Sequence, residues 1–206
     1  MSAAHHEEMA RAETSKADQE NQVAEKACPG YETQDACYRY WTSFRNPTKK
    51  HFDRARAHRD LATKHRAASA ALREVEARSC AGVPDEERDV SPFFHVEDIA
   101  SVETLPATLR GGDVVTGARV VFRQLPGMTA DWLQHVIDCH LARNAVVGVE
   151  HEHMSYCPLG VPHVTALVHA VAGGLAVEIQ PSNEAGSQDV KRRTDELIRM
   201  RNAPGS

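Results

Sequence analysis

The sequence lacks any long apolar run, so it predicts no membrane-spanning helix. No stretch of the chain approaches the roughly 18–20 apolar residues that cross a bilayer. The N-terminal segment also lacks the apolar stretch that a signal peptide carries. Aromatic residues make up only 5% of the chain, so we expect any hydrophobic core to consist mainly of Val, Leu, Ile and Ala.

Several signatures of function are missing as well. Lys and Arg number 24 against 29 Asp and Glu, and a chain without a basic excess is not expected to bind nucleic acid. No C-x-x-C pair indicates a zinc ribbon or a thioredoxin-like site. No glycine-rich phosphate loop or nucleophile motif is present either. We therefore expect a non-enzymatic protein, with a cysteine-dependent enzyme using Cys139 or Cys157 as an alternative.

The five cysteines leave the cellular compartment open. Cys28 and Cys37, or Cys139 and Cys157, are close enough in sequence to form disulfides, which persist in oxidising compartments outside the cytosol. Free thiols in a cytoplasmic protein are the other interpretation. Spacing alone does not choose between them, because a disulfide depends on the distance between the two Cα atoms.

The N-terminal half is expected to be helical and polar. Residues 1–27 favour helix by composition but have little to bury, so they form either an exposed helix or a disordered segment. An aromatic connector reaches residue 48. From there to Ser79 no Gly or Pro interrupts a long helix with Thr48 as N-cap. We divide the chain into segments 1–48, 49–100 and 101–200, with a tail at 201–206.

Two columns with seven-residue spacing run along the helix 48–79. One contains His51, His58, His65 and Leu72, and the other contains Arg54, Leu61, Ala68 and Val75. Seven residues of helix rise about 10.5 Å, so successive histidines of one column cannot bind the same metal ion. We expect a partly buried polar stripe beneath the N-terminal segment, able to respond to pH because histidine titrates between about pH 5 and 8.

The C-terminal half is expected to fold as a small α+β domain. A possible short strand at 101–105 precedes a β-α-β-β-α order, in which Gly173-Gly174 joins the last two strands. A three- or four-stranded sheet with two helices on one face would bury these segments. The expected elements are strand 118–125, helix 130–145, strands 164–171 and 175–180, and a helix within 182–200.

A group of histidine and sulfur side chains suggests a transition-metal site. In an extended segment two histidines two residues apart point to the same side, and a His and a Cys at i and i+4 share one face of a helix. Imidazole and sulfur ligands suit copper or zinc. A loose polar loop, or a disulfide that uses both cysteines, is the competing interpretation. The candidate ligands are His135, Cys139, His151, His153, Met154 and Cys157.

Residues 71–93, 129–144 and 155–161 resemble uncharacterised bacterial lipoproteins. The resemblance implies a helical segment followed by a small α+β domain, a location in the periplasm or cell envelope, and membrane attachment through an N-terminal lipid anchor. It implies no activity. Our expectation is a non-enzymatic envelope protein that binds a protein partner or a small ligand. A copper- or zinc-binding protein is the alternative, and a cytoplasmic location follows if all cysteines are free.

Overall fold

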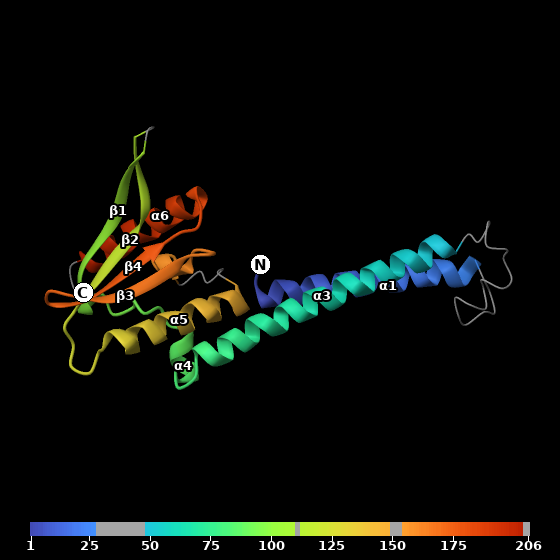
Figure 1. Cartoon of the computed structure of the whole chain (residues 1–206), viewed down its shortest axis with the longest axis horizontal. Helices are drawn as coiled ribbons and strands as arrows, with labels where there is room; N and C mark the ends of the chain where they lie inside the picture. The colour runs from blue at the N-terminus through green and yellow to red at the C-terminus, as the bar shows by residue number, and fades with distance from the viewer. Residues whose placement is uncertain (28–47, 110–111, 149–153, 204–206) are drawn as a thin grey trace. The chain divides into compact units, whose positions relative to one another are not determined.

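The structure is a computed structural model that describes residues 1–27, 48–109, 112–148 and 154–203. These residues form two compact units, Met1–Ala71 and Leu72–Ser206 (Figure 1). The boundary between the units falls within one long helix. Each unit has its own packing.

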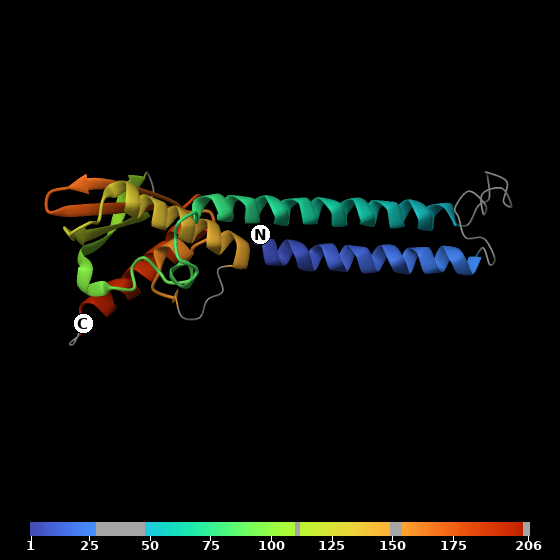
Figure 2. The ribbon, with the colours of Figure 1, turned by 90° about the horizontal axis from the view of Figure 1, so that it is seen from below.

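The first unit is a helical hairpin. Helix α1 (Ala3–Ala27) lies antiparallel beside α3 (Lys49–Ser79), as the two ribbons in Figure 2 show. The predicted helix 48–79 is therefore confirmed. Of the two alternatives for residues 1–27, the helix is the one found. The aromatic connector, with Cys28 and Cys37, lies at 28–47, outside the described residues.

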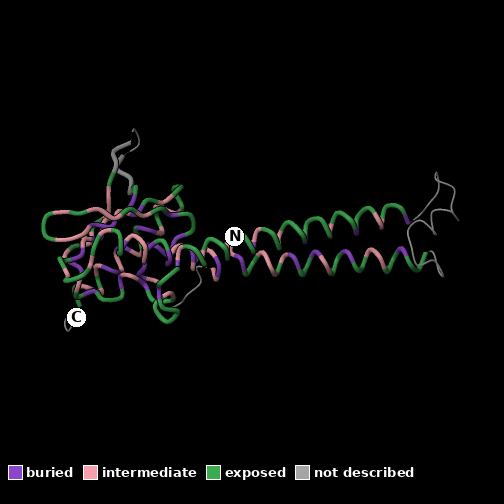
Figure 3. Tube along the Cα trace, turned by 60° about the horizontal axis from the view of Figure 1, so that its bottom comes forward, coloured by how far each residue is buried: buried purple, intermediate pink, exposed green. Residues whose placement is uncertain are grey.

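Small side chains make the core of this hairpin. In each helix a buried position recurs every seven residues. Figure 3 shows this repeat most clearly along α1, the helix that starts at the N-terminus. Alanine at these positions lets two helices approach closely, but each contact removes little apolar surface from water. These repeating positions are Ala3, Ala10, Ala17 and Ala24 in α1, and Thr48, just before α3, followed by Ala55, Ala62 and Ser69 in α3.

One of the two predicted columns of α3 faces away from this core. Leu61 and Val75 are each 42% exposed, so they are not the inward residues of the hairpin. In the sequence, Leu61 and Val75 stood out as a packing column because they are large apolar residues. The alanine column is the one that packs, because the facing side of α1 offers alanine and no larger apolar side chain.

The second unit is an α+β domain, as predicted. Its four strands pair antiparallel in the order β1-β2-β4-β3. The strand expected at 101–105 is real and longer than predicted. The strands are β1 (Ile99–Leu109), β2 (Gly112–Arg123), β3 (Thr165–Val171) and β4 (Gly174–Gln180), and the helices are α4 (Asp85–Arg88), α5 (Ala130–Val147) and α6 (Glu184–Arg201).

Local sequence signals explain where several of these elements begin. The Thr129 hydroxyl accepts a hydrogen bond from the backbone N–H of Trp132 at 3.2 Å, as an N-cap of α5. Gly173 has φ +83°, a left-handed conformation that glycine adopts easily, in the turn between β3 and β4. At Gly174 an added Cβ atom would overlap the carbonyl oxygen of Phe122, so only glycine fits there.

Helices α5 and α6 cover the same face of the sheet. Ile137 of α5 and Leu197 of α6 belong to one buried cluster with Val120 and Val177 of the sheet. The opposite face carries a charged row, in which Arg119 lies between Glu103 and Glu178. The helices thus build a single core on one side and leave a polar face on the other.

Candidate functional site in the helical hairpin

The predicted metal ligands at 135–157 do not all converge. Nε2 of His135 lies 2.9 Å from the carbonyl oxygen of Ala81 and donates a hydrogen bond to it. The Met154 side chain packs against the domain core. His151 and His153 lie outside the described residues. In the part of the chain that the structure describes, no three or more His, Cys, Asp or Glu side chains are placed to hold a metal ion.

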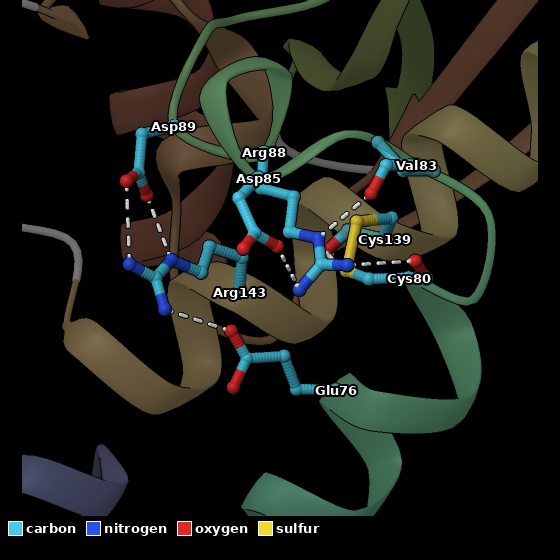
Figure 4. A network of polar contacts seen from close by, with 8 residues as sticks. All are labelled: Glu76, Cys80, Val83, Asp85, Arg88, Asp89, Cys139 and Arg143. Carbon is cyan, nitrogen blue, oxygen red and sulfur yellow. Dashed lines mark hydrogen bonds and ion pairs between the residues drawn. A yellow bond between two sulfur atoms is a disulfide. The ribbon is translucent and has the colours of Figure 1, made fainter.

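Cys139 forms a disulfide with Cys80, so the pairing of Cys139 with Cys157 that the sequence left open is not the one formed (Figure 4). The two Cα atoms are 4.5 Å apart, although 59 residues separate them in sequence. Cys139 packs in a small cluster with Cys80 and Val83, whereas Cys157 belongs to the main core. A disulfide sulfur is not a thiolate. Cys139 therefore cannot act as a thiolate ligand or as a nucleophile while the disulfide is intact.

The remaining candidate nucleophile, Cys157, is completely buried. Its sulfur lies 3.7 Å from Nε2 of His140, which is also buried. Burial raises the pKa of the Cys157 thiol, with weaker opposing effects led by a hydrogen bond with Ser91. The thiolate is the reactive form of cysteine, so this environment favours a structural thiol.

The histidine column of α3 forms a different constellation, which we call the histidine seam. It consists of three side-chain pairs between α1 and α3: Glu20 with His51, Glu13 with His58, and His6 with His65. Each step of seven residues forward in α1 matches a step of seven residues backward in α3. This is the register of an antiparallel helix pair, and it confirms the predicted polar stripe under the N-terminal segment.

We call each of these three pairs a rung of the seam. Two rungs join an imidazole to a carboxylate. Nδ1 of His51 lies 2.5 Å from Oε2 of Glu20, and Nδ1 of His58 lies 2.5 Å from Oε2 of Glu13. Since an ionised carboxylate only accepts hydrogen bonds, Nδ1 is the protonated nitrogen in both rings. Glu13 is only 5% exposed and also accepts a hydrogen bond from Nζ of Lys16 at 2.7 Å.

These contacts stabilise the charged carboxylates. The pKa of Glu13 is lowered, chiefly by the hydrogen bond from Lys16 and then by that from His58. The pKa of Glu20 is lowered chiefly by the hydrogen bond from His51. Both rungs therefore hold a negatively charged carboxylate against an imidazole.

The third rung has no carboxylate. Nδ1 of His6 lies 3.0 Å from Nδ1 of His65, with the ring planes 44° apart. The pKa of His6 is lowered, first by burial and then by the nearby His65. Protonation of both rings would place like charges at hydrogen-bond distance, which disfavours the doubly charged pair.

The seam partners on α1 escaped the sequence analysis although a signal was present. His6, Glu13 and Glu20 repeat every seven residues, as do Ala3, Ala10 and the later alanines of α1. Alanine contributes little to a search for large apolar residues, so this repeat was not recognised as a packing face. Cys80 was overlooked because no local spacing connects it with Cys139.

Comparison of the chain with protein-family models, with curated proteins and with solved structures finds no match. The helices of the described part of the chain include none that is both long enough and apolar enough to cross a membrane. What the structure itself defines is the class: an α+β domain joined in one chain to an antiparallel helical hairpin with a titratable seam.

Proposed function

We propose that the protein is a non-enzymatic protein of the cell envelope and that its helical hairpin binds a protein partner. The disulfide between Cys80 and Cys139 carries the proposal, because disulfides persist in oxidising compartments and are rare in the cytosol. The resemblance of residues 71–93, 129–144 and 155–161 to bacterial lipoproteins points to the same location.

The hairpin suits the binding role. Its core is built from alanine, so the pair of helices buries little apolar surface for its length. Val23 of α1 and Leu61 of α3 are large apolar residues that remain 45% and 42% exposed. A helical partner that covered such side chains would add the apolar burial that the hairpin itself lacks.

The state of Cys157 favours binding over cysteine-based catalysis. A nucleophilic cysteine needs access to substrate and a thiolate at working pH. Cys157 is fully buried and its pKa is raised by burial. The copper or zinc alternative stays a prediction for the loop with His151 and His153, without Cys139 as a thiolate.

The compartment is tested in the native host by trapping free thiols in intact cells before lysis. We expect Cys80 and Cys139 to be protected from alkylation and recovered as one disulfide-linked peptide in the envelope fraction. A reduced, alkylated pair in a cytosolic fraction would reject the envelope assignment.

The binding role is tested by a photo-crosslinking residue placed at Leu61 on the hairpin. The matched control is the same residue at Leu167, which is 62% exposed on β3 of the α+β domain. We expect one discrete protein adduct from position 61 and none from position 167. Adducts only from position 167, or none from either position, would contradict a partner-binding hairpin.

A further inference from the structure

The third rung of the histidine seam differs from the other two in a way that points to a ligand. The rungs of His51 and His58 each satisfy an imidazole with a carboxylate, whereas His6 and His65 present their Nδ1 atoms to each other at 3.0 Å. Two neutral imidazoles share a single proton in such a contact, since one nitrogen donates and the other accepts.

We propose that His6 and His65 bind a divalent first-row transition-metal ion, such as Cu(II) or Zn(II), between α1 and α3, with water completing its coordination. This inference goes beyond the proposed function and does not depend on it. The site also differs from the predicted one at 135–157, since it uses none of the same residues.

The distance between the two nitrogens fits chelation with a small adjustment. Imidazole nitrogens bind such ions at roughly 2.0–2.1 Å, so two of them at about 90–110° around one ion are about 2.9–3.4 Å apart. The observed 3.0 Å lies within that interval. To bind, the ring that donates moves its proton from Nδ1 to Nε2, and both Nδ1 lone pairs then face the ion; the charge of the two rings does not change.

The protonation state favours the metal as well. A histidine ligand is neutral, and protons compete with metal ions for its nitrogen. The pKa of His6 is lowered, first by burial and then by His65, which favours the neutral, metal-binding form of His6. Both side chains are partly exposed, so an ion and its water ligands have access from solvent.

The rest of the seam does not compete for the ion in the same way. His58 and His51 each use Nδ1 in a bond to a carboxylate, and seven residues of helix separate the successive rungs. Two protein ligands from two helices give an open site, and Cu(II) is the favoured ion because it heads the affinity order for nitrogen ligands.

The test is calorimetric titration of the oxidised full-length protein with Cu(II) and with Zn(II) near neutral pH. His6→Gln and His65→Gln are each expected to lose one bound equivalent, or to weaken it by at least about tenfold. His5→Gln is the matched control, since His5 is the exposed neighbour of His6 and its side chain lies 3.7 Å from Glu8 rather than against α3. We expect His5→Gln to bind the metal as the unsubstituted protein does. All three variants are expected to keep their helicity.

A second measurement needs no substitution. Zn(II) added to the unsubstituted protein is expected to shift the imidazole nitrogen resonances of His6 and His65 at one equivalent, and to leave those of His58 in place. Unchanged His6 and His65 resonances, or an equivalent lost in a His151→Gln/His153→Gln variant and kept in His6→Gln, would overturn the assignment. Failure of this test leaves the partner-binding proposal intact, because that proposal is tested separately by photo-crosslinking from position 61.

Discussion

At the scale of single residues, the α+β domain depends on one arginine that joins three segments. Arg143 of α5 donates to Asp89 through Nε at 2.7 Å and to Glu76 of α3 through Nη1 at 2.9 Å (Figure 4). Its pKa is raised by the hydrogen bonds to Asp89 and Glu76. Glu76 is only 13% exposed, so its charge relies on this partner.

Replacing Arg143 by Met therefore removes the counter-ion of a mostly buried carboxylate. We expect Arg143→Met to lower the free energy of unfolding by about 1–2 kcal/mol, because charge-assisted hydrogen bonds are lost and Glu76 is left poorly compensated. Urea unfolding at neutral pH measures the change. The control is Arg78→Met, since the Arg78–Glu74 pair is 69% and 70% exposed and its loss should cost little.

At the scale of elements, the hairpin shows how small side chains select a packing face. Ala55 lies at 0% exposure in the core of the hairpin, whereas Ala57 of the same helix is exposed. Leucine and alanine both favour helix, so a substitution at either position tests packing more than helix propensity.

We expect Ala55→Leu to destabilise the hairpin by about 1–3 kcal/mol, because the larger side chain forces the helices apart. Ala57→Leu is expected to leave hairpin stability nearly unchanged. Hydrogen exchange of peptides from α1 reports the effect directly, since α1 is held by this interface. Equal protection in both variants would show that the alanine column is not the contact.

The seam also predicts how the hairpin responds to acid. A group whose pKa is lowered in the folded state stabilises the fold above its ordinary pKa, and that stability is lost as the pH falls through the folded value. This applies to His6, with an ordinary pKa of 6.5, and to Glu13 and Glu20, with 4.5. The charged or titratable groups acting on these three are His65, His5, the N-terminal amine, Lys16, His58, His51 and Arg54.

Acidification is therefore expected to loosen α1 in two stages. Protection of α1 peptides, corrected for the intrinsic exchange rate, should fall first as the pH drops below about 6.5 and again below about 4.5. His6→Gln should remove the first stage, and Glu13→Gln/Glu20→Gln the second. Protection that rises as the pH falls would contradict the direction given by the three lowered pKa values.

At the scale of the whole molecule, the disulfide is the longest-range covalent constraint that the described residues contain. It joins Cys80 to Cys139 across 59 residues within the second unit. Around it, Arg88 donates to the carbonyl oxygens of Val83 at 3.0 Å and Cys80 at 3.3 Å. The disulfide thus holds the turn after α3 against α5, and the hydrogen bonds of Arg88 fix α4 to the same turn.

Removing this disulfide should weaken the second unit measurably. We expect the Cys80→Ser/Cys139→Ser variant to lose about 2–4 kcal/mol of unfolding free energy, because the unfolded chain gains the freedom of an open loop. Denaturant unfolding with and without reductant measures the loss. The native protein should become less stable on reduction, whereas the stability of the variant should not change. If reductant lowered the stability of both proteins equally, the loss would not come from this disulfide.

Much of the fold could be predicted from residues alone. Thr48 and Thr129 marked helix starts, Gly173-Gly174 marked the β3–β4 turn, and the seven-residue histidine column marked a polar stripe that meets the N-terminal segment. These signals are local, since caps, turns and helical periodicity depend on neighbouring residues of one segment. They determined the α+β class and the helical N-terminal half.

Only the tertiary structure decided which distant groups meet. It paired Cys139 with Cys80 and placed Glu13 against His58, and it brought His6 to His65. The physical reason is that such contacts depend on which faces of two separate elements pack together. In this hairpin alanine, the side chain with the weakest apolar signal in the sequence, decides that packing and with it the rungs of the seam.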